Sequence, residues 1–253
     1  MTKKILEDDI ENFWNEHPCG EDLVGKYDDD IKIFFKDYDH YRYSVEDHIP
    51  SCLDKISFDG KKVLEIGLGQ GTESEQIIKR GGIWTGIDLT EESIERVKTR
   101  LRIKNLNYEN ILKGSVKLMQ FPDNYFDIIF SHGVLHHVPE IDTAQKEIRR
   151  VIKNNGELII MLYAKNSLNF YLSIAFLRRI ALFFLYFMNL PLRGKLKLHI
   201  ENAKKDGLFN YLRMKNFIHK NTDGPLNPYS KVYNKKLVKD DFYLFNIKKI
   251  YKK

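Results

Sequence analysis

The residues best suited to chemistry in this chain stand at the ends of two apolar runs. Three glycines at alternate positions follow the run that begins at Val63; they are Gly67, Gly69 and Gly71. Glycine lets a backbone turn sharply and approach a ligand closely. The next run, residues 83–88, ends in Asp88, whose carboxylate can accept hydrogen bonds from both hydroxyls of a ribose. A strand, a glycine turn, a helix, a second strand and an acid predict a half-site for an adenosine-type cofactor.

Charge beside the glycine turn narrows the choice of cofactor. The spacing is G-x-G-x-G, whereas dinucleotide enzymes use G-x-G-x-x-G. Glu65 precedes the turn, and Thr72 and Glu73 follow it. A pyrophosphate needs a bare helix N-terminus and is disfavoured beside these carboxylates. S-adenosylmethionine, which carries a sulfonium and an amino group but no phosphate, suits them better.

Two later segments extend this pattern. They are Phe121-Pro122-Asp123-Asn124-Tyr125-Phe126-Asp127 and Ser131-His132-Gly133-Val134-Leu135-His136-His137-Val138. Together with residues 63–71 and Asp88, these segments resemble class I S-adenosylmethionine-dependent methyltransferases. They are especially similar to the broad bacterial group related to ubiquinone- and menaquinone-biosynthesis methyltransferases (methyltransferase type 11). The resemblance covers roughly residues 60–163 in order, so it is more specific than any single motif.

Carried over by position, the resemblance implies three groups of cofactor contacts. A first loop, around the methionine part and the ribose, would consist of Glu65, Gly67, Gly69, Gly71 and Thr72. Asp88 would hold the ribose hydroxyls, and Leu89 would pack on the adenine. Ser115 and Val116 would lie by the adenine edge. The floor where the methyl group meets its acceptor would be lined by Ser131, His132 and Gly133.

This chain departs from the family pattern at two places. The family usually has an acidic residue where Ser115 stands, and a neutral hydroxyl binds the adenine amino group more weakly. The family sheet also ends in a hairpin, whereas this sequence predicts only helix 234–241 and one strand near 243–251. Either the last strand is missing or the strand count is off by one. A missing strand would leave a sheet edge that a partner subunit, such as a second copy of the chain in a homodimer, could cover.

The elements that must position these residues follow from hydrophobic periodicity. Five strands are expected, at residues 63–67, 83–88, 109–113, 126–131 and 157–163. Helices 72–80 and 141–153 alternate with them, and Thr90 is the expected N-cap of another helix. This alternation predicts an α/β fold with a Rossmann-like, doubly wound, mostly parallel sheet that has helices on both faces.

We expect four regions along the chain. They are a helical N-terminal cap at 1–59, the cofactor-binding core at 60–163, a helical and loop cap at 164–233, and the last helix and strand of the core at 234–253. The first cap contains Tyr41-Arg42-Tyr43. Arg42 could close over the cofactor and pair with its carboxylate, or it could belong to an ordinary amphipathic helix junction.

Composition sets the broad class of this 253-residue chain. Its hydrophobic content of 43% supports a sizeable core, and two cysteines predict a reduced, cytoplasmic protein rather than a disulfide scaffold. The net charge of +6 is uneven, from −9 over residues 1–60 to +11 over residues 193–253. The basic residues form no arginine-rich tract and no nucleic-acid-binding motif, so we expect a solvated surface rather than nucleic-acid binding.

Residues 168–192 form two apolar, aromatic-rich runs around Arg178-Arg179. Neither run is long enough to span a bilayer. One interpretation is a pair of cap helices packed on the core. The other is an interfacial segment in peripheral contact with a membrane, or a lid over a hydrophobic substrate, with the arginines at the surface.

The histidines are the candidate bases, but no catalytic residue is assigned. His136 and His137 are adjacent and would point to opposite sides of an extended segment, so no metal site is expected. Methyl transfer from an activated cofactor needs positioning and exclusion of water more than a base. If the acceptor must lose a proton, the candidates are His132, His136 and His219.

The predicted function is methyl transfer from S-adenosylmethionine to a small acceptor. The aromatic content of 168–192 favours a hydrophobic or lipid-linked acceptor. A non-catalytic cofactor-binding or interaction protein is the first alternative, and a nicotinamide-dependent oxidoreductase on a similar sheet is the second. Binding of S-adenosylmethionine but not NADH would separate the methyltransferase from the oxidoreductase.

Overall fold

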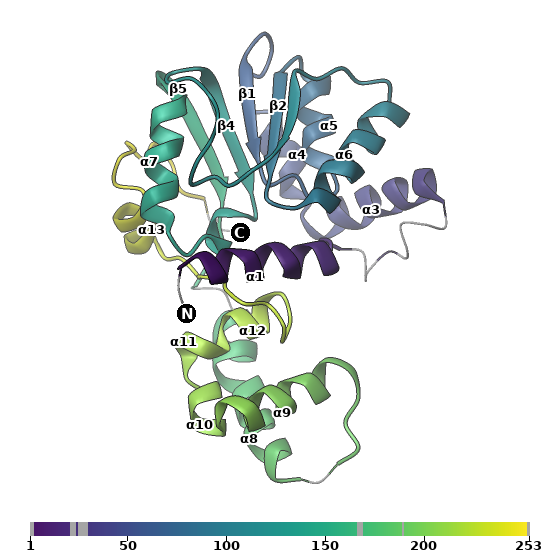
Figure 1. Cartoon of the computed structure of the whole chain (residues 1–253), viewed down its shortest axis with the longest axis vertical. Coiled ribbons are helices and arrows are strands. Elements are labelled where there is room, and N and C mark those ends of the chain that lie inside the picture. Colours follow the sequence, from purple (N-terminus) through teal and green to yellow (C-terminus); the bar gives the residue numbers. More distant parts are fainter. Residues whose placement is uncertain (1–2, 21–23, 25–29, 166–168, 189, 252–253) are drawn as a thin grey trace. The chain divides into compact units, whose positions relative to one another are not determined.

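The computed structural model describes residues 3–20, 24, 30–165, 169–188 and 190–251 (Figure 1). The chain folds into two compact units. The sheet unit consists of Trp14–Val134 and Asp142–Met161. The helical unit consists of Met1–Phe13, Leu135–Ile141 and Leu162–Lys253. The chain therefore passes from one unit to the other several times.

The sheet unit contains five parallel strands in the order β3-β2-β1-β4-β5 (Figure 1). The strands are β1 (Lys62–Ile66), β2 (Ile83–Asp88), β3 (Asn110–Lys113), β4 (Phe126–His132) and β5 (Ile152–Met161). This order confirms the predicted Rossmann-like α/β fold. Because the strand order reverses between β1 and β4, ligands are expected outside the carboxyl ends of these strands.

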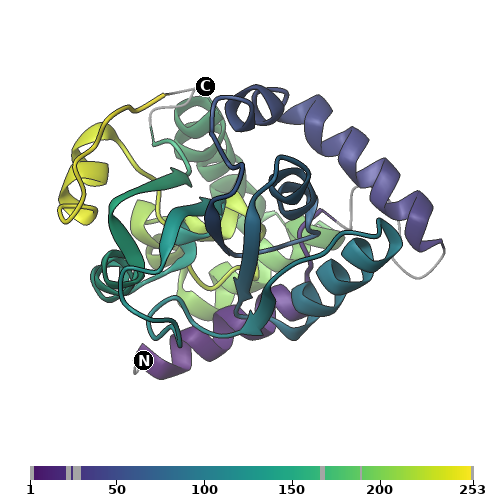
Figure 2. The ribbon, with the colours of Figure 1, turned by 90° about the horizontal axis from the view of Figure 1, so that it is seen from above.

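Helices connect and cover the strands (Figure 2). They are α3 (Ile31–Val45), α4 (His48–Leu53), α5 (Thr72–Lys79), α6 (Glu91–Ile103) and α7 (Ile141–Val151); α1 (Lys3–Glu16) begins in the helical unit. The crossovers through α5 and α6 run away from β1 in one direction, whereas the crossover through α7 runs in the other. Right-handed crossovers in opposite directions place helices on both faces of the sheet.

The sheet unit has its own hydrophobic core, as its periodicity predicts. Ile94, Val97 and Leu101 of α6 are buried, and they pack in one cluster with residues of β1, β2 and β4. Thr90 is the N-cap of α6, since its Oγ1 accepts a hydrogen bond of 3.3 Å from the Ser93 amide. The described residues between 14 and 59, a range predicted as part of a cap, are grouped with the sheet unit.

The helical unit is built from short elements around a second core. These are η1 (Leu135–His137), the π-helix η2 (Asn169–Leu177), α8 (Arg178–Phe187), α9 (Gly194–Asp206), α10 (Leu208–Tyr211), α11 (Met214–Phe217), α12 (His219–Thr222) and α13 (Lys235–Asp241). Ile174, Leu182, Ile200 and Phe217 are buried together in this core. Among the described residues, no helix has both the length and the apolar character needed to cross a membrane.

The strand predicted near 243–251 is wrong. Residues 246–251 have no regular secondary structure, and the segment follows a turn after α13. Phe242 is buried, but Tyr243 and Tyr251 are exposed and Lys248-Lys249 lie between them, so the segment lacks a continuous apolar face. Aromatic residues alone suggest a strand here, and they do not pair with the described sheet.

Candidate functional site

Parallel strands bring the predicted site residues to one edge of the sheet. Asp88 at the end of β2 is in register with Lys113, and His132 at the end of β4 is in register with Met161. β1 ends at Ile66 and leads into the glycine turn, where the Gly67 amide donates to the Ile87 carbonyl at 2.9 Å. All twelve predicted cofactor contacts lie within the sheet unit.

The glycine turn is held by left-handed backbone angles and close packing. Gly67 has φ +78°, and a Cβ there would lie 2.1 Å from Cγ2 of Val134, so no other residue fits. Gly69 differs, because a Cβ there would have only Cys19 Cβ near it, at 4.0 Å. The backbone at Gly69 is thus bare on the side where a side chain would stand, which leaves room for a ligand.

Asp88 organises this turn from the neighbouring strand. Its Oδ2 accepts from the Leu68 amide at 2.6 Å, and its Oδ1 accepts from the Thr90 amide at 2.8 Å and the Thr90 hydroxyl at 2.7 Å. Burial raises the pKa of Asp88, and these donors oppose that rise. The carboxylate therefore already holds the shape of the turn, and its contact with a ribose stays a prediction.

Glu65 is the second buried acid of the turn. Its side chain is 2% exposed and accepts a hydrogen bond of 2.7 Å from the Trp84 indole N–H. Burial raises the pKa of Glu65 from 4.5 to about 8, and the nearby carboxylates of Glu73 and Asp88 act in the same direction. Near neutral pH the residue is mostly protonated, and a cation bound beside it would favour the charged form. This chemistry fits a sulfonium or ammonium group.

His132 is held at the end of β4 by an arginine from α3. Arg42 Nη2 lies 2.8 Å from His132 Nδ1, and Arg42 also pairs with Glu73 at 3.1 Å and with Glu46 at 2.8 Å. A guanidinium has donors and no acceptor, so Nδ1 must accept. Burial lowers the pKa of His132, although the Glu73 carboxylate opposes it. The neutral ring therefore carries its proton on Nε2.

The Nε2 atom of His132 is buried and has no hydrogen-bond partner among the described residues. Buried polar atoms are nearly always satisfied, and exceptions often face a ligand that the protein alone does not supply. Arg42 is engaged with Glu73, Glu46 and the imidazole, which favours a positioning role over direct pairing with a cofactor carboxylate.

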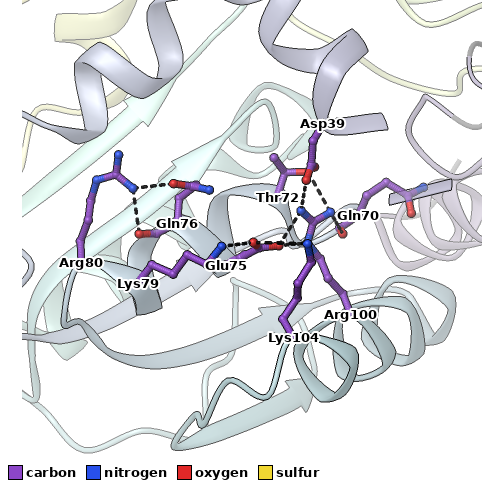
Figure 3. A network of polar contacts seen from close by, with 9 residues as sticks. All are labelled: Asp39, Gln70, Thr72, Glu75, Gln76, Lys79, Arg80, Arg100 and Lys104. Atoms are coloured by element: carbon purple, nitrogen blue, oxygen red, sulfur yellow. Dashed lines mark hydrogen bonds and ion pairs between the residues drawn. The ribbon is translucent and has the colours of Figure 1, made fainter. Parts of the chain in front are cut away.

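Thr72 belongs to a buried polar network, drawn in Figure 3. Its hydroxyl donates to Asp39 at 3.0 Å, and Arg100 of α6 reaches Asp39 at 2.5 Å and Glu75 at 2.8 Å. The Arg100 side chain is fully buried. This network ties α3 to the first turns of α5 and to α6, so it fixes the helix that carries Arg42.

Sequence reasoning missed Arg100, although a signal for it existed. Position 100 falls on the apolar stripe of its helix, three residues after Val97. A charged residue on a buried stripe requires a charged partner. The partner Asp39 lies 61 residues earlier, and no spacing rule connects the two.

The remaining predicted residues lie near the same edge. Ser131 is buried and donates from Oγ to the Ile66 carbonyl at 3.0 Å, which joins the ends of β4 and β1. Gly133 has φ +79° and donates to the Met161 carbonyl at 3.3 Å. Val116 is buried, and Leu89 and Ser115 are half-buried. Oγ of Ser115 accepts from the Lys117 amide at 3.2 Å, so it takes part in a local turn.

His136 and His137 belong to the helical unit, and the extended conformation expected for them is wrong. They lie in the 3-10 turn η1 with ring centroids 4.3 Å apart. His137 Nδ1 lies 2.9 Å from the Tyr229 carbonyl oxygen, and His136 packs against Tyr163 with centroids 3.7 Å apart. These contacts indicate a packing role for the pair.

His219 lies in α12 of the same unit, and burial lowers its pKa to about 4. The described residues contain no group of three His, Cys, Asp or Glu side chains that could hold a metal ion.

Comparison with known proteins places this edge within a recognised domain. Residues 64–160 match the family described as "Methyltransferase domain". A ubiquinone biosynthesis O-methyltransferase of Coxiella burnetii is 32% identical over 112 residues, 44% of this chain and 47% of the relative. A sterol 24-C-methyltransferase of Aspergillus fumigatus is 32% identical over 100 residues, 39% of this chain and 26% of the relative.

Among solved structures, a SAM dependent methyltransferase from Aquifex aeolicus aligns with a TM-score of 0.46 and 25% identity. The alignment covers 50% of this chain and 69% of that one. The chain spans less than half the length of the two curated relatives. Residues 64–160, from the first strand to the fifth, thus match a methyltransferase domain.

Proposed function

We propose that this protein transfers a methyl group from S-adenosylmethionine to a small, hydrophobic or lipid-linked acceptor. The observation that carries the proposal is the bare Gly69 backbone beside buried Glu65 and Asp88, inside the segment that matches a methyltransferase domain. When bound, the cofactor supplies an electrophilic methyl group on a cationic sulfur. Two relatives described above are named as a ubiquinone-biosynthesis methyltransferase and a sterol methyltransferase, and these names support a hydrophobic acceptor.

The residues of the chain would bind and orient the reactants. The turn at 67–71 would receive the cofactor along its backbone, with Glu65 charging as the cation binds and Asp88 keeping the turn in shape. Leu89 and Val116 would provide apolar contact for the adenine. Such a site accelerates transfer mainly by positioning two reactants and excluding water.

His132 would act as a hydrogen-bond donor rather than as a base. Because Arg42 occupies Nδ1, the Nε2–H can donate to an oxygen of the acceptor or of the cofactor carboxylate. A donor orients an oxygen and stabilises negative charge on it, whereas removal of a proton would need a free nitrogen lone pair. This arrangement favours an acceptor that is already nucleophilic when it enters the site.

The first test is isothermal titration of the protein with S-adenosylmethionine and S-adenosylhomocysteine, with NADH as the control ligand. We expect both sulfur compounds to bind, NADH not to bind, and Asp88→Ala to weaken binding by at least about tenfold. Asp142→Ala, an exposed acid on α7, is the matched control and should leave binding unchanged. Binding of NADH alone would support the oxidoreductase instead.

Proton release on cofactor binding tests the cofactor site independently of methyl transfer. Near pH 7, titration in buffers of different ionisation heat should show proton release when the sulfonium binds, because the pKa of Glu65 falls toward its ordinary value. Glu65→Gln should bind without that release. Binding with no proton release in the native protein would contradict the assigned contact of Glu65 with the cation.

Turnover with candidate acceptors tests the alternative of a non-catalytic binding protein. Radiolabelled methyl transfer to quinone precursors, sterols and polar sugars should label an apolar class. Transfer only to a sugar or a nucleic acid would contradict the acceptor class, and cofactor binding without transfer to any extract would favour the non-catalytic role. A cytoplasmic location is also part of the proposal, supported by a sequence that contains only two cysteines, Cys19 and Cys52.

A further inference from the structure

One face of α8, extended by Leu177 directly before it, is apolar and exposed. Leu177, Ile180, Phe184 and Phe187 follow one another at intervals of three and four residues, which puts them on one stripe. Their exposed fractions are 53%, 41%, 61% and 67%. Large apolar side chains gathered on one face of a helix mark an interaction surface more often than chance exposure does. We name this stripe, together with exposed Met188 and Leu190 after it, the α8 surface.

The opposite face of α8 already fills the core of the helical unit. Leu182 is 3% exposed and is buried with Ile200 and Ala203 of α9. The helix is therefore anchored by one face while the other stays uncovered within its own unit. The exposed stripe of leucine, isoleucine and phenylalanine does not contribute to the core of this unit, so we infer that it binds another molecule or surface.

Charge beside the stripe indicates what that occupant is. No aspartate or glutamate occurs between Glu157 and Glu201, whereas lysine and arginine recur in this segment. Arg193 and Lys195 are exposed at the start of α9, directly after the apolar stretch that ends α8. The N-terminus of a helix is itself positive, and α9 has no side-chain cap there. The α8 surface thus adjoins basic residues in a stretch of sequence that carries no acid.

We propose that the α8 surface rests on an anionic lipid bilayer. Phe184 and Phe187 would enter the boundary between headgroups and acyl chains, and Arg193 and Lys195 would meet lipid phosphates. An apolar helix face flanked by cations is the pattern of helices that lie in the membrane interface. A second copy of the chain is disfavoured, because a two-fold interface would bring the same cations together. This inference goes beyond methyl transfer and does not depend on it.

The test is flotation of the native protein with lipid vesicles. We expect binding to vesicles that contain about one third phosphatidylglycerol and much weaker binding to phosphatidylcholine alone. Phe184→Ser with Phe187→Ser should weaken binding at least about tenfold, and so should Arg193→Glu with Lys195→Glu. Phe209→Ser and Lys204→Glu with Lys205→Glu are the matched controls, since these residues are exposed elsewhere in the same unit.

Several results would overturn the proposal. They are absence of binding to both kinds of vesicle, equal binding by native protein and all variants, and a dimer in solution that the Phe184→Ser and Phe187→Ser changes convert to a monomer. The last would assign the surface to a second copy. S-adenosylhomocysteine titration of every variant keeps this test separate from the proposed function, since the changes lie outside the cofactor-binding residues.

Discussion

At the scale of single residues, the protonation states of two side chains define the site as much as its geometry does. The contact with Arg42 makes His132 a hydrogen-bond donor through Nε2, and burial keeps the Glu65 carboxyl mostly protonated near neutral pH. Neither role follows from residue type, because free histidine and glutamate would respectively accept a proton near pH 6.5 and lose one near pH 4.3. The local environment therefore determines which chemistry the edge of the sheet offers.

Replacing Arg42 by glutamine should raise the pKa of His132. It should also remove the guanidinium contact that holds the proton of the neutral imidazole on Nε2. The positive charge of Arg42 lowers that pKa, while Glu73 raises it, so removal of the charge leaves Glu73 to act. Nuclear magnetic resonance of labelled histidine should show the titration midpoint of His132 at higher pH in the variant. Nitrogen shifts in the native protein should show the proton on Nε2, and a proton on Nδ1 there would refute the assignment. Arg80→Gln, which breaks an ion pair with Asp54, is the control.

Stability should depend on pH through Glu65. Its folded pKa of about 8 lies above the ordinary 4.5, so the folded state holds a proton that the unfolded chain releases. The stabilisation from this proton is full below about pH 4.5 and is lost as the pH rises through about 8. Thermal unfolding of the native protein and Glu65→Gln at about pH 5 and about pH 9 should therefore show a growing advantage for glutamine. Glu95→Gln, at an exposed site, should show no such trend.

At the scale of elements, α3 is fixed to the sheet unit through charge. Asp39 and Arg42 lie one turn apart on α3. Asp39 pairs with Arg100, and Arg42 contacts His132. The site thus depends on a helix that precedes the first strand. Figure 3 shows the carboxylates of Asp39 and Glu75 both reaching the guanidinium group of Arg100.

Arg100→Met should destabilise the protein by about 1–3 kcal/mol, because it removes the buried ion pair with Glu75, which then keeps half-exposed Lys79 as its close cationic partner. Urea unfolding followed by tryptophan fluorescence is the measurement. Arg102→Met, at an exposed position of the same helix, should change the stability by less than about 0.5 kcal/mol. Equal effects of the two changes would mean that the network contributes little.

Elements were more predictable than the contacts between them. The five strands and the Thr90 cap follow from local sequence patterns and were confirmed by the structure. The Arg42–His132 contact joins residues 90 positions apart, and nothing in the sequence relates them. The wrong strand at 243–251 has the same cause, because pairing with a sheet depends on distant partners that local composition does not reveal.

At the scale of the whole molecule, the two units have separate cores. The first cluster joins strands and helices of the sheet unit, and the second joins η2, α8, α9, α10 and α11 of the helical unit. All predicted cofactor contacts lie in the sheet unit, whereas the α8 surface lies in the helical unit. Cofactor binding and membrane contact are therefore expected to be separable by mutation. The homodimer, expected from an uncovered sheet edge, stays a prediction.

Cofactor binding should stabilise one unit more than the other. A ligand at about a hundred times its Kd adds about 2.7 kcal/mol to the stability of the part that binds it. In scanning calorimetry with S-adenosylhomocysteine, we expect the midpoint temperature of unfolding of the sheet unit to rise by about 5–10 °C. Hydrogen exchange should slow in β1 and β4 and remain unchanged in α8. A single transition that moves as a whole would show that the units unfold together.

The discontinuous path of the chain limits how this protein can be recombined with its relatives. The helical unit is assembled from three stretches, and the chain enters two of them directly after Val134 and Met161, next to the ends of β4 and β5. Exchange of that unit for another therefore needs three coordinated segments rather than one cassette. The junctions of such an exchange would have to preserve Gly133 and the hydrogen bond from its amide to the Met161 carbonyl. Without that hydrogen bond, the exchange would disturb the ends of β4 and β5.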